Sequence, residues 1–177
     1  MSDDNSKYNR METKIIRAAT DSDAQVIADI YNYYIAHTVV TFEEQPVSWR
    51  DILDRMAKVA DSNLPWLVAA DAGVVVGYAY AAKWNARSAY RHTAESTVYL
   101  SHTAVANGWG TQLYQTLFDK LRLAAIHSVI GGITLPNPAS VALHEKFGMK
   151  KVAHFKEVGY KFGRWLDVGY WQVELKD

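Results

Sequence analysis

The chain has 177 residues, which is enough for one domain with a substantial hydrophobic core. Its 19 basic residues balance its 19 acidic residues, so no overall charge points to a nucleic acid or an anionic membrane as a partner. The absence of Cys excludes disulfides, thiolate metal sites and a cysteine nucleophile.

The N-terminus is polar and lacks the apolar core of a signal peptide. We expect residues 1–12 to form a disordered tail and residues 13–177 to form a single domain. The longest apolar stretch, 66–82, is interrupted by Asp71 and two glycines, which is typical of a strand pair and not of a membrane span. These features predict a cytoplasmic protein.

The first third of the chain carries one strand signal and two helix signals. A strand is predicted over 14–17, and Thr20 or Asp21 then caps a helix with apolar residues at helical spacing. The apolar face of that helix comprises Ala24, Ile27, Ala28, Tyr31, Tyr34 and Ile35. After a polar loop, Ser48 is a suitable N-cap for a second helix that continues to about Ala60.

The middle of the chain predicts a hairpin, a strand and the longest helix. Apolar runs over 66–70 and 74–81 flank a turn, and a polar, aromatic connection leads into a strand that ends at Leu100. A helix over 108–125 follows, and a β-branched strand is predicted over 128–134. The apolar face of this helix comprises Leu113, Tyr114, Leu117, Phe118 and Leu121.

The last part of the chain predicts a short helix and two strands. The helix covers 139–147, and Gly148 is a left-handed residue just past its C-terminus. Strands are expected over 150–158 and 168–175, separated by 159–165. Because strands and helices follow each other in mixed order, we expect an α/β domain in which parallel and antiparallel pairs share one sheet.

A strand, a glycine-bearing loop and a helix start meet near residue 108. Glycines at Gly108 and Gly110 allow close backbone approach, and the free N–H groups of the first helical turn, which Thr111 opens, favour an anion. Glu95 lies upstream on the preceding strand. A phosphate cradle beside one acidic residue predicts a phosphorylated cofactor at a site that handles protons, although Gly-x-Gly alone also fits a simple tight turn.

Several motifs together resemble one enzyme family. Residues 137–140 and 143–149, after the glycine loop and the next strand, look like the acetyl-CoA site of the GCN5-related N-acetyltransferases (GNAT). Stretches similar to the phosphinothricin and methionine sulfoximine acetyltransferases are 78–80, Trp84, 89–90, 93–99, 135–137, 144–145 and 159–168. The resemblance covers about residues 13–175. It implies a mostly antiparallel central sheet with splayed strands flanked by helices, acetyl-CoA as co-substrate and a homodimer.

The resemblance also implies which residues meet acetyl-CoA. They are Val98, Tyr99, Leu100, Ala106, Asn107, Gly108, Trp109, Gly110, Thr111, Asn137 and Ser140. Two positions depart from the family, because Val105 and Asn107 stand where a basic or amide side chain and a basic residue are usual. Backbone N–H groups still bind phosphate, so we keep the assignment. Met149 replaces an aromatic residue, which we interpret as core packing.

Acetyl transfer needs a base for the amine, a donor to the oxyanion and a proton for the thiolate. The resemblance implies Glu95 as the base through water, the backbone N–H of Tyr99 as the donor, and a proton-shuttling role for His144. Glu95 as a structural ion pair and His144 as a packed helix residue are the alternatives. The other histidines show no ligand spacing, so we expect no metal.

Basic residues precede Glu95 at intervals of four: Lys83, Arg87 and Arg91. If Arg87 or Arg91 points inward, its guanidinium offers a bidentate clamp for a carboxylate or phosphinate; otherwise this is a solvated basic loop. The residues expected to meet the substrate are Asn85, Ala86, Arg87, Arg91, Glu95, Ser96, Thr97 and Phe42. Phe42 sits in a loop, 37–46, that either anchors a solvated connection or walls the pocket.

The sequence therefore predicts acetyl transfer from acetyl-CoA to the α-amine of a small amino acid such as phosphinothricin or methionine sulfoximine, by direct attack. The alternatives are a non-catalytic acyl-CoA sensor and an acetyltransferase for a polyamine or a peptide N-terminus.

Overall fold

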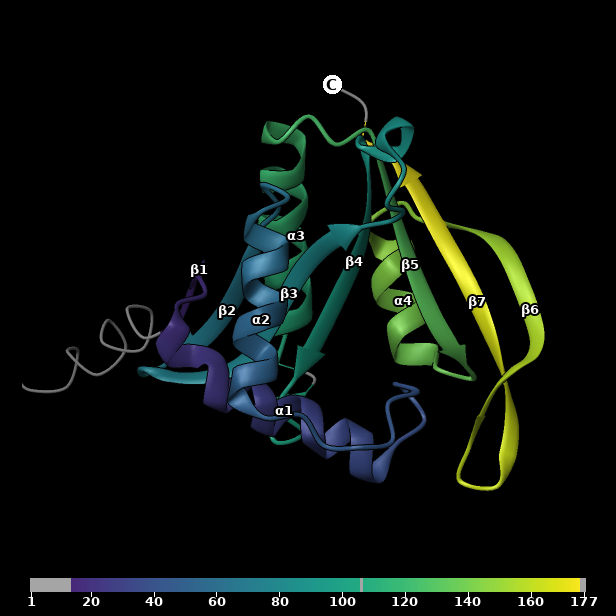
Figure 1. Ribbon diagram of the computed structural model, residues 1–177, viewed down its shortest axis with the longest axis horizontal. Coiled ribbons are helices and arrows are strands. Elements are labelled where there is room, and N and C mark those ends of the chain that lie inside the picture. The colour runs from purple at the N-terminus through teal and green to yellow at the C-terminus, as the bar shows by residue number, and fades with distance from the viewer. Residues whose placement is uncertain (1–13, 106, 176–177) are drawn as a thin grey trace, which may run out of the picture.

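One seven-stranded sheet organises the chain, in the order β1-β2-β3-β4-β5-β7-β6 (Figure 1). The computed structural model describes residues 14–105 and 107–175. The strands are β1 (Lys14–Ala18), β2 (Trp66–Asp71), β3 (Val74–Lys83), β4 (Thr93–Leu100), β5 (Ser128–Leu135), β6 (Lys150–Lys161) and β7 (Arg164–Glu174). The helices are α1 (Ala24–His37), α2 (Trp49–Ala60), α3 (Trp109–Leu123) and α4 (Pro138–Lys146), with short 3₁₀ turns η2 (Asp21–Asp23) and η3 (Ser88–Tyr90).

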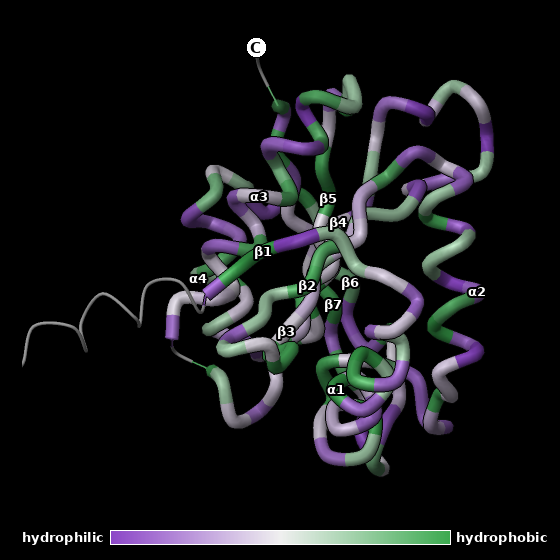
Figure 2. The backbone as a smooth tube through the Cα atoms, turned by 90° about the vertical axis from the view of Figure 1, so that its left-hand side faces the viewer, coloured by the Kyte–Doolittle hydropathy of each residue, from purple (hydrophilic) through white to green (hydrophobic). Residues whose placement is uncertain are grey.

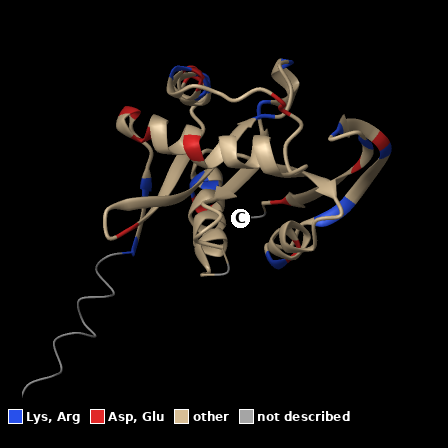
Figure 3. Cartoon of the chain, turned by 90° about the horizontal axis from the view of Figure 1, so that it is seen from below, with Lys and Arg blue, Asp and Glu red and all other residues tan. Residues whose placement is uncertain are grey.

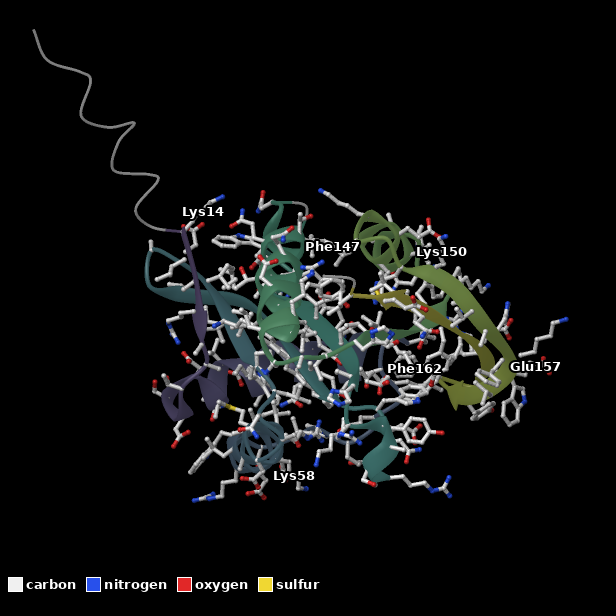
Figure 4. The ribbon with its side chains drawn as sticks, turned by 90° about the horizontal axis from the view of Figure 1, so that it is seen from above. Lys14, Lys58, Phe147, Lys150, Glu157 and Phe162 are labelled. Atoms are coloured by element: carbon white, nitrogen blue, oxygen red, sulfur yellow. The ribbon has the colours of Figure 1, made fainter. Side chains whose placement is uncertain are left out.

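Helices cover the two faces of the sheet and create two cores. On one face, Ile27 of α1 and Ile52 of α2 belong to a cluster with Val68 and Tyr78 of the sheet. On the other face, the apolar side of α3 packs with Val129 of β5 in the larger cluster. Figure 2 shows hydrophilic and hydrophobic residues alternating along α2, as expected of a helix with one buried side. Figure 4 places Phe147 between α3 and α4, where its ring meets Phe118 at 5.3 Å.

The N-terminal helix predictions are confirmed with one refinement. Thr20 caps the turn η2, which runs directly into α1, and its backbone N–H donates to Asp23 Oδ2 at 2.8 Å. Arg17 holds the same carboxylate through two hydrogen bonds of 2.7 and 2.8 Å. Ser48 caps α2 and accepts from the backbone N–H of Asp51. Both caps satisfy donors that a helix start leaves free.

The sheet is mixed, as the sequence predicted, with antiparallel pairing everywhere except between β4 and β5. The residues over 159–165 are a correction, because they lie mostly within β6 and β7 and do not separate two shorter strands. The tight turn comprises only Phe162 and Gly163, both with positive φ. Gly148 has a φ of 78°, which confirms its expected left-handed conformation.

Charge is spread over the surface. Figure 3 shows basic and acidic residues on the helices and on the outer hairpin, with both signs present in each region. Within the described ranges, no helix is long and apolar enough to cross a membrane. The expected tail over residues 1–12 lies outside the part of the chain that the structure describes.

Candidate active site

A gap between β4 and β5 forms the centre of the site. The two strands pair over only three positions, the last of which is Glu95 with Ile130, and then diverge toward their C-terminal ends (Figure 1). A cavity of about 200 Å³ opens where they separate. It is lined by Val40, Thr41, Glu95, Ser96, Thr97, Val98, Tyr99, Tyr114, Gly132, Ile133, Thr134, Asn137, Ser140 and His144.

The register of β4 decides which backbone groups face this gap. The N–H of Ser101 donates to β3 at 2.8 Å, whereas the carbonyl of His92 accepts from Ser128 at the start of β5 at 3.1 Å. Backbone groups alternate sides along a strand, so even-numbered residues of β4 face β5. The edge N–H groups beyond the last pair therefore belong to Val98 and Leu100.

This geometry corrects the role expected of Tyr99 as the oxyanion donor. Tyr99 is odd-numbered like Ser101, so its N–H points toward β3 and away from the gap. Its ring still lines the cavity, and it packs edge-on against Tyr31 at 5.1 Å. Its even-numbered neighbours Val98 and Leu100 are the residues that present their N–H groups to the gap. The carbonyl of Leu100 accepts a hydrogen bond of 2.7 Å from Tyr34.

Glu95 lies at the point where the strands separate. Its side chain is half-buried and shares a sheet face with Gly132 and Tyr170, because a Cβ added to Gly132 would sit 3.5 Å from Glu95 Oε1 and 3.1 Å from Tyr170 Cε1. Burial raises the pKa of the Glu95 carboxyl above its usual value. None of the ion pairs formed by the described residues includes Glu95. A carboxylate whose pKa is raised by burial is a stronger base than a solvent-exposed one, which suits it to accept a proton from an amine.

His144 reaches the cavity from the opposite face of the sheet. It projects from α4, is 4% exposed, and packs so closely on β5 that a Cβ added to Gly131 would overlap its imidazole. Its Nδ1 lies 2.7 Å from the carbonyl oxygen of Ser140, and its Nε2 lies 3.1 Å from the hydroxyl of Tyr114. Burial lowers the pKa of His144 below its usual value.

The start of α3 supplies free donors next to the gap. Gly108, with a φ of 78°, turns the chain into the helix, and the first helical N–H groups have no intrahelical acceptor. A Cβ added to Gly110 would lie 3.4 Å from Leu143 and 3.8 Å from Leu100, so the missing side chain faces the core, and close approach of this backbone to a ligand stays a prediction. Trp109 is buried in the core. Asn107 is exposed, and Ala106 lies outside the described residues.

A lysine that the sequence did not single out stands beside this helix start. Lys146, in the last turn of α4, donates to Thr111 Oγ1 at 3.3 Å. Its ammonium group therefore lies at the first turn of α3, where the sequence resemblance predicts a pyrophosphate. It supplies a positive charge that Val105 and Asn107 do not.

Asn137 and Ser140 occupy the start of α4. Asn137 Oδ1 accepts from the N–H of Ser140 at 3.1 Å, so Asn137 is the N-cap of the helix as well as a lining residue of the cavity. Ser140 also positions His144 through its carbonyl group. Asn137 therefore caps the helix that carries the imidazole, and Ser140 fixes the orientation of the ring.

The residues expected to meet the substrate fall into two groups. Ser96 and Thr97 line the cavity. Asn85, Ala86, Arg87 and Arg91 are exposed and line no part of it. Arg91 donates to the carbonyl of Ser88 at 3.3 Å, within its own segment. In this single chain the proposed guanidinium clamp is therefore not brought to Glu95.

Phe42 and its loop form a wall that is fixed to the outer hairpin. The Phe42 ring covers Gly159 so closely that a Cβ there would overlap it. The buried Lys161 donates to the carbonyl of Thr41 at 2.8 Å, and Thr41 lines the cavity. The pocket-wall interpretation of the loop is favoured over a solvated connection, although the contact comes from Thr41 and Val40 and not from Phe42.

An apolar hollow of about 270 Å³ lies on the same face of the sheet as Glu95. Its lining consists of Trp84, Ile130, Val152, Ala153, Phe155 and Tyr170. Ile130 is the pairing partner of Glu95, and Tyr170 approaches the carboxylate across Gly132. The sequence does not reveal this hollow, because its residues come from three strands, β5, β6 and β7, and from the loop that carries Trp84. Nor does the sequence reveal that Tyr114 lines the cavity, because this residue fits the apolar face predicted for a helix.

The site thus combines an open strand edge, a half-buried carboxylate, the free N–H groups of a helix start and a nearby lysine. The profile of the acetyltransferase (GNAT) domain matches residues 16–169. The chain is 43% identical to the phosphinothricin N-acetyltransferase of Streptomyces viridochromogenes, over 91% of this chain and 87% of that protein. It is 34% identical to the L-methionine sulfoximine/L-methionine sulfone acetyltransferase of Salmonella typhimurium, over 92% and 95%.

Solved structures of acetyltransferases are also similar to this chain. The phosphinothricin acetyltransferase of Sinorhizobium meliloti, solved in complex with acetyl-CoA, superposes with a TM-score of 0.89 at 34% identity, over 92% of this chain and 89% of that one. An acetyltransferase structure from Salmonella typhimurium with its cofactor acetyl-CoA gives 0.90 at 33% identity, over 93% and 95%. The chain belongs to the GNAT family of acetyltransferases. It is an acyltransferase whose co-substrate is acetyl-CoA, and the open edge of β4 and the start of α3 fit that molecule.

Replacing Lys146 by Gln is expected to raise the KM for acetyl-CoA about tenfold with little change in kcat, because a charge-assisted contact to phosphate is lost. Steady-state kinetics with varied acetyl-CoA measure this, and the difference is expected to shrink at high salt. Lys150→Gln, on the exposed start of β6, is the matched control. An unchanged KM for acetyl-CoA in Lys146→Gln would mean that the lysine does not contact the phosphates of acetyl-CoA.

Proposed function

We propose that this enzyme acetylates the α-amine of a small amino acid by direct attack. The observation that carries the proposal is the position of Glu95, half-buried at the mouth of the gap and on the same strand as the edge N–H groups of Val98 and Leu100. A base and an oxyanion donor thus converge on one cavity. Because the sequence has no Cys, an acyl-enzyme on a cysteine is excluded.

Each group has a defined task in this scheme. Acetyl-CoA supplies the acetyl thioester. Glu95 takes a proton from the substrate amine through a water molecule, and its raised pKa matches that task. The N–H of Val98 or Leu100 polarises the carbonyl oxygen. His144 stands on the other side of the gap as the source of a proton for sulfur.

The substrate class is inferred from the relatives and from the hollow beside Glu95. Relatives named for phosphinothricin and for methionine sulfoximine both act on compact amino-acid analogues. The hollow lined by Trp84, Tyr170 and the other apolar residues favours a methionine-like side chain. A polyamine would instead need acidic residues there. Arg87 and Arg91 remain candidates for the substrate's acidic group if the segment that carries them is supplied by a second subunit.

A thiol-release assay across amines tests the proposal. We expect turnover with methionine sulfoximine, methionine sulfone and phosphinothricin, and little with spermidine or a peptide N-terminus. We also compare kcat/KM for methionine sulfone with that for phosphinothricin. A preference for the sulfone favours recognition by the apolar hollow, and a preference for phosphinothricin favours recognition by the arginine clamp. Turnover of the polyamine without any amino-acid substrate would refute the proposed substrate class.

We also propose a cytoplasmic homodimer. The hairpin of β6 and β7 extends beyond the rest of the sheet, and Figure 4 shows Phe162 and Glu157 on this outer part. Tyr160, Phe162 and Trp165 there are each more than half exposed. Exposed aromatic residues in one place favour an interface. Light scattering of the purified protein measures the subunit number directly, and a monomer at micromolar concentration would contradict the proposal.

A further inference from the structure

A chain of buried hydrogen bonds connects α4, α3 and β4 behind the gap. His144 Nε2 lies 3.1 Å from the Tyr114 hydroxyl, which lies 3.3 Å from Ser96 Oγ. Ser96 Oγ in turn lies 3.5 Å from the carbonyl of Ile130. All three side chains line the cavity, yet Tyr114 is fully buried and Ser96 and His144 are nearly so. The chain therefore reaches the gap from the protein interior.

Elementary donor rules fix the direction of these bonds. The carbonyl of Ser140 only accepts, so the imidazole carries its proton on Nδ1 and donates to that oxygen. A neutral imidazole then has an acceptor at Nε2, and the Tyr114 hydroxyl must donate to it. Burial raises the pKa of Tyr114, so its hydroxyl keeps its proton.

Protonation of His144 reverses the chain. With a proton on both ring nitrogens, Nε2 donates to the Tyr114 oxygen, and the Tyr114 hydroxyl turns to donate to Ser96. The Ser96 hydroxyl then accepts from Tyr114 and can turn its own proton from the carbonyl of Ile130 into the gap. Of the described titratable groups, Tyr114 of α3 contacts the imidazole directly, and Glu95 of β4 acts on Tyr114 by its charge.

We propose that Tyr114 and Ser96 act with His144 as a relay that delivers a proton to the departing sulfur, with Tyr114 as the residue that positions the imidazole and passes the proton on to Ser96. The inference rests on the proposed acetyl transfer. In that reaction a bond forms between the amine nitrogen and the acetyl carbonyl carbon, and the bond from that carbon to sulfur breaks. Nitrogen loses one proton to water beside Glu95, and sulfur gains one.

The relay accounts for the proton that sulfur gains. Ser96 gives its proton to sulfur, Tyr114 gives its own to Ser96, and Nε2 gives its own to Tyr114. His144 is left neutral with its proton on Nδ1, and the Tyr114 hydroxyl again donates to Nε2. This final state is the arrangement that the structure shows. A proton from water, balanced by the one released at Glu95, restores the charged imidazole.

Tyr114→Phe tests the relay because it removes one oxygen and keeps the ring that packs against Phe118 at 5.3 Å. We expect kcat to fall about tenfold while the KM for acetyl-CoA stays unchanged. Ser96→Ala should lower kcat in the same way. Tyr33→Phe, a half-buried tyrosine of α1 stacked on His102, is the matched control and should behave as the parent.

A second readout does not need activity. Nitrogen NMR of the free parent protein should show neutral His144 with its proton on Nδ1. In Tyr114→Phe the charged Nε2–H has no acceptor, so the pKa of His144 should fall and the alkaline limb of the kcat profile should move to lower pH. Ser96→Ala should leave the titration of His144 nearly unchanged.

The outcomes separate the two proposals. An inactive parent refutes the proposed function, yet the NMR result still decides whether the bonds run as described. An active parent with an unchanged rate and an unchanged His144 titration in Tyr114→Phe overturns the relay. A proton on Nε2 of neutral His144 in the parent also overturns it.

Discussion

Replacing Glu95 by Gln is expected to lower kcat/KM for amine acetylation by roughly two to three orders of magnitude, because the amide cannot accept the amine proton. The acid limb of the parent pH profile should disappear in the variant. That limb arises because the raised pKa of Glu95 delays its ionisation as pH rises. Thiol-release kinetics from pH 5.5 to 9 measure both effects, and Glu174→Gln, at the exposed end of β7, is the control.

The same variant should be at least as stable as the parent at neutral pH. Burial raises the folded-state pKa of Glu95 above that of the unfolded chain, so the folded state holds its proton over a wider pH range. This contribution to stability is present below the unfolded pKa and is lost as pH rises through the folded pKa. Gln carries no charge to bury. Thermal unfolding at pH 7 checks this, and a clear loss of stability would mean that the carboxylate has a structural partner.

Gly131→Ala should combine loss of activity with loss of stability. The added Cβ would overlap the His144 imidazole, with Met149 Cε also only 3.5 Å away. Because α4 packs directly behind β5, the ring must leave its place between Ser140 and Tyr114. Overpacking of this kind costs about 1–3 kcal/mol, and we expect kcat to fall at least about tenfold.

A double-mutant cycle with His144→Ala separates the two effects. Removing the imidazole makes room for the new methyl group, so the double variant should be less destabilised than the sum of the single variants. Its activity should stay as low as that of His144→Ala alone. Chemical denaturation and thiol release measure the four proteins. Additive stabilities would mean that the methyl group is accommodated elsewhere than at His144.

Hydrophobic periodicity predicted most of the fold. The apolar faces of α1 and α3 are buried as expected, and the glycine-centred turn between β2 and β3 lies where composition places it. The boundary between β6 and β7 was wrong, because residues 159–165 contain Gly159 and Gly163 and look like a loop. Gly159 instead accommodates the Phe42 ring within a strand, a contact between segments more than one hundred residues apart.

The site was predictable wherever one strand or one turn carried it. Glu95 and His144 line the same cavity, as the family resemblance implied. Register was not predictable from sequence, so the oxyanion donor was assigned to Tyr99 instead of its neighbours. Lys146 and Tyr114 were missed for another reason. Each lies on a helix, and only the packing of α3 beside α4 brings their polar atoms to the cavity and to the first turn of α3.

The short pairing of β4 with β5 has a consequence for mutational tolerance. Val98 and Leu100 present their N–H groups to the gap, while their side chains pack against the core that contains α3. Recognition through the N–H groups leaves the choice among apolar side chains open, so a library of apolar residues at these two positions should yield many active clones. Proline, which alone lacks the amide hydrogen, should be absent from the active clones.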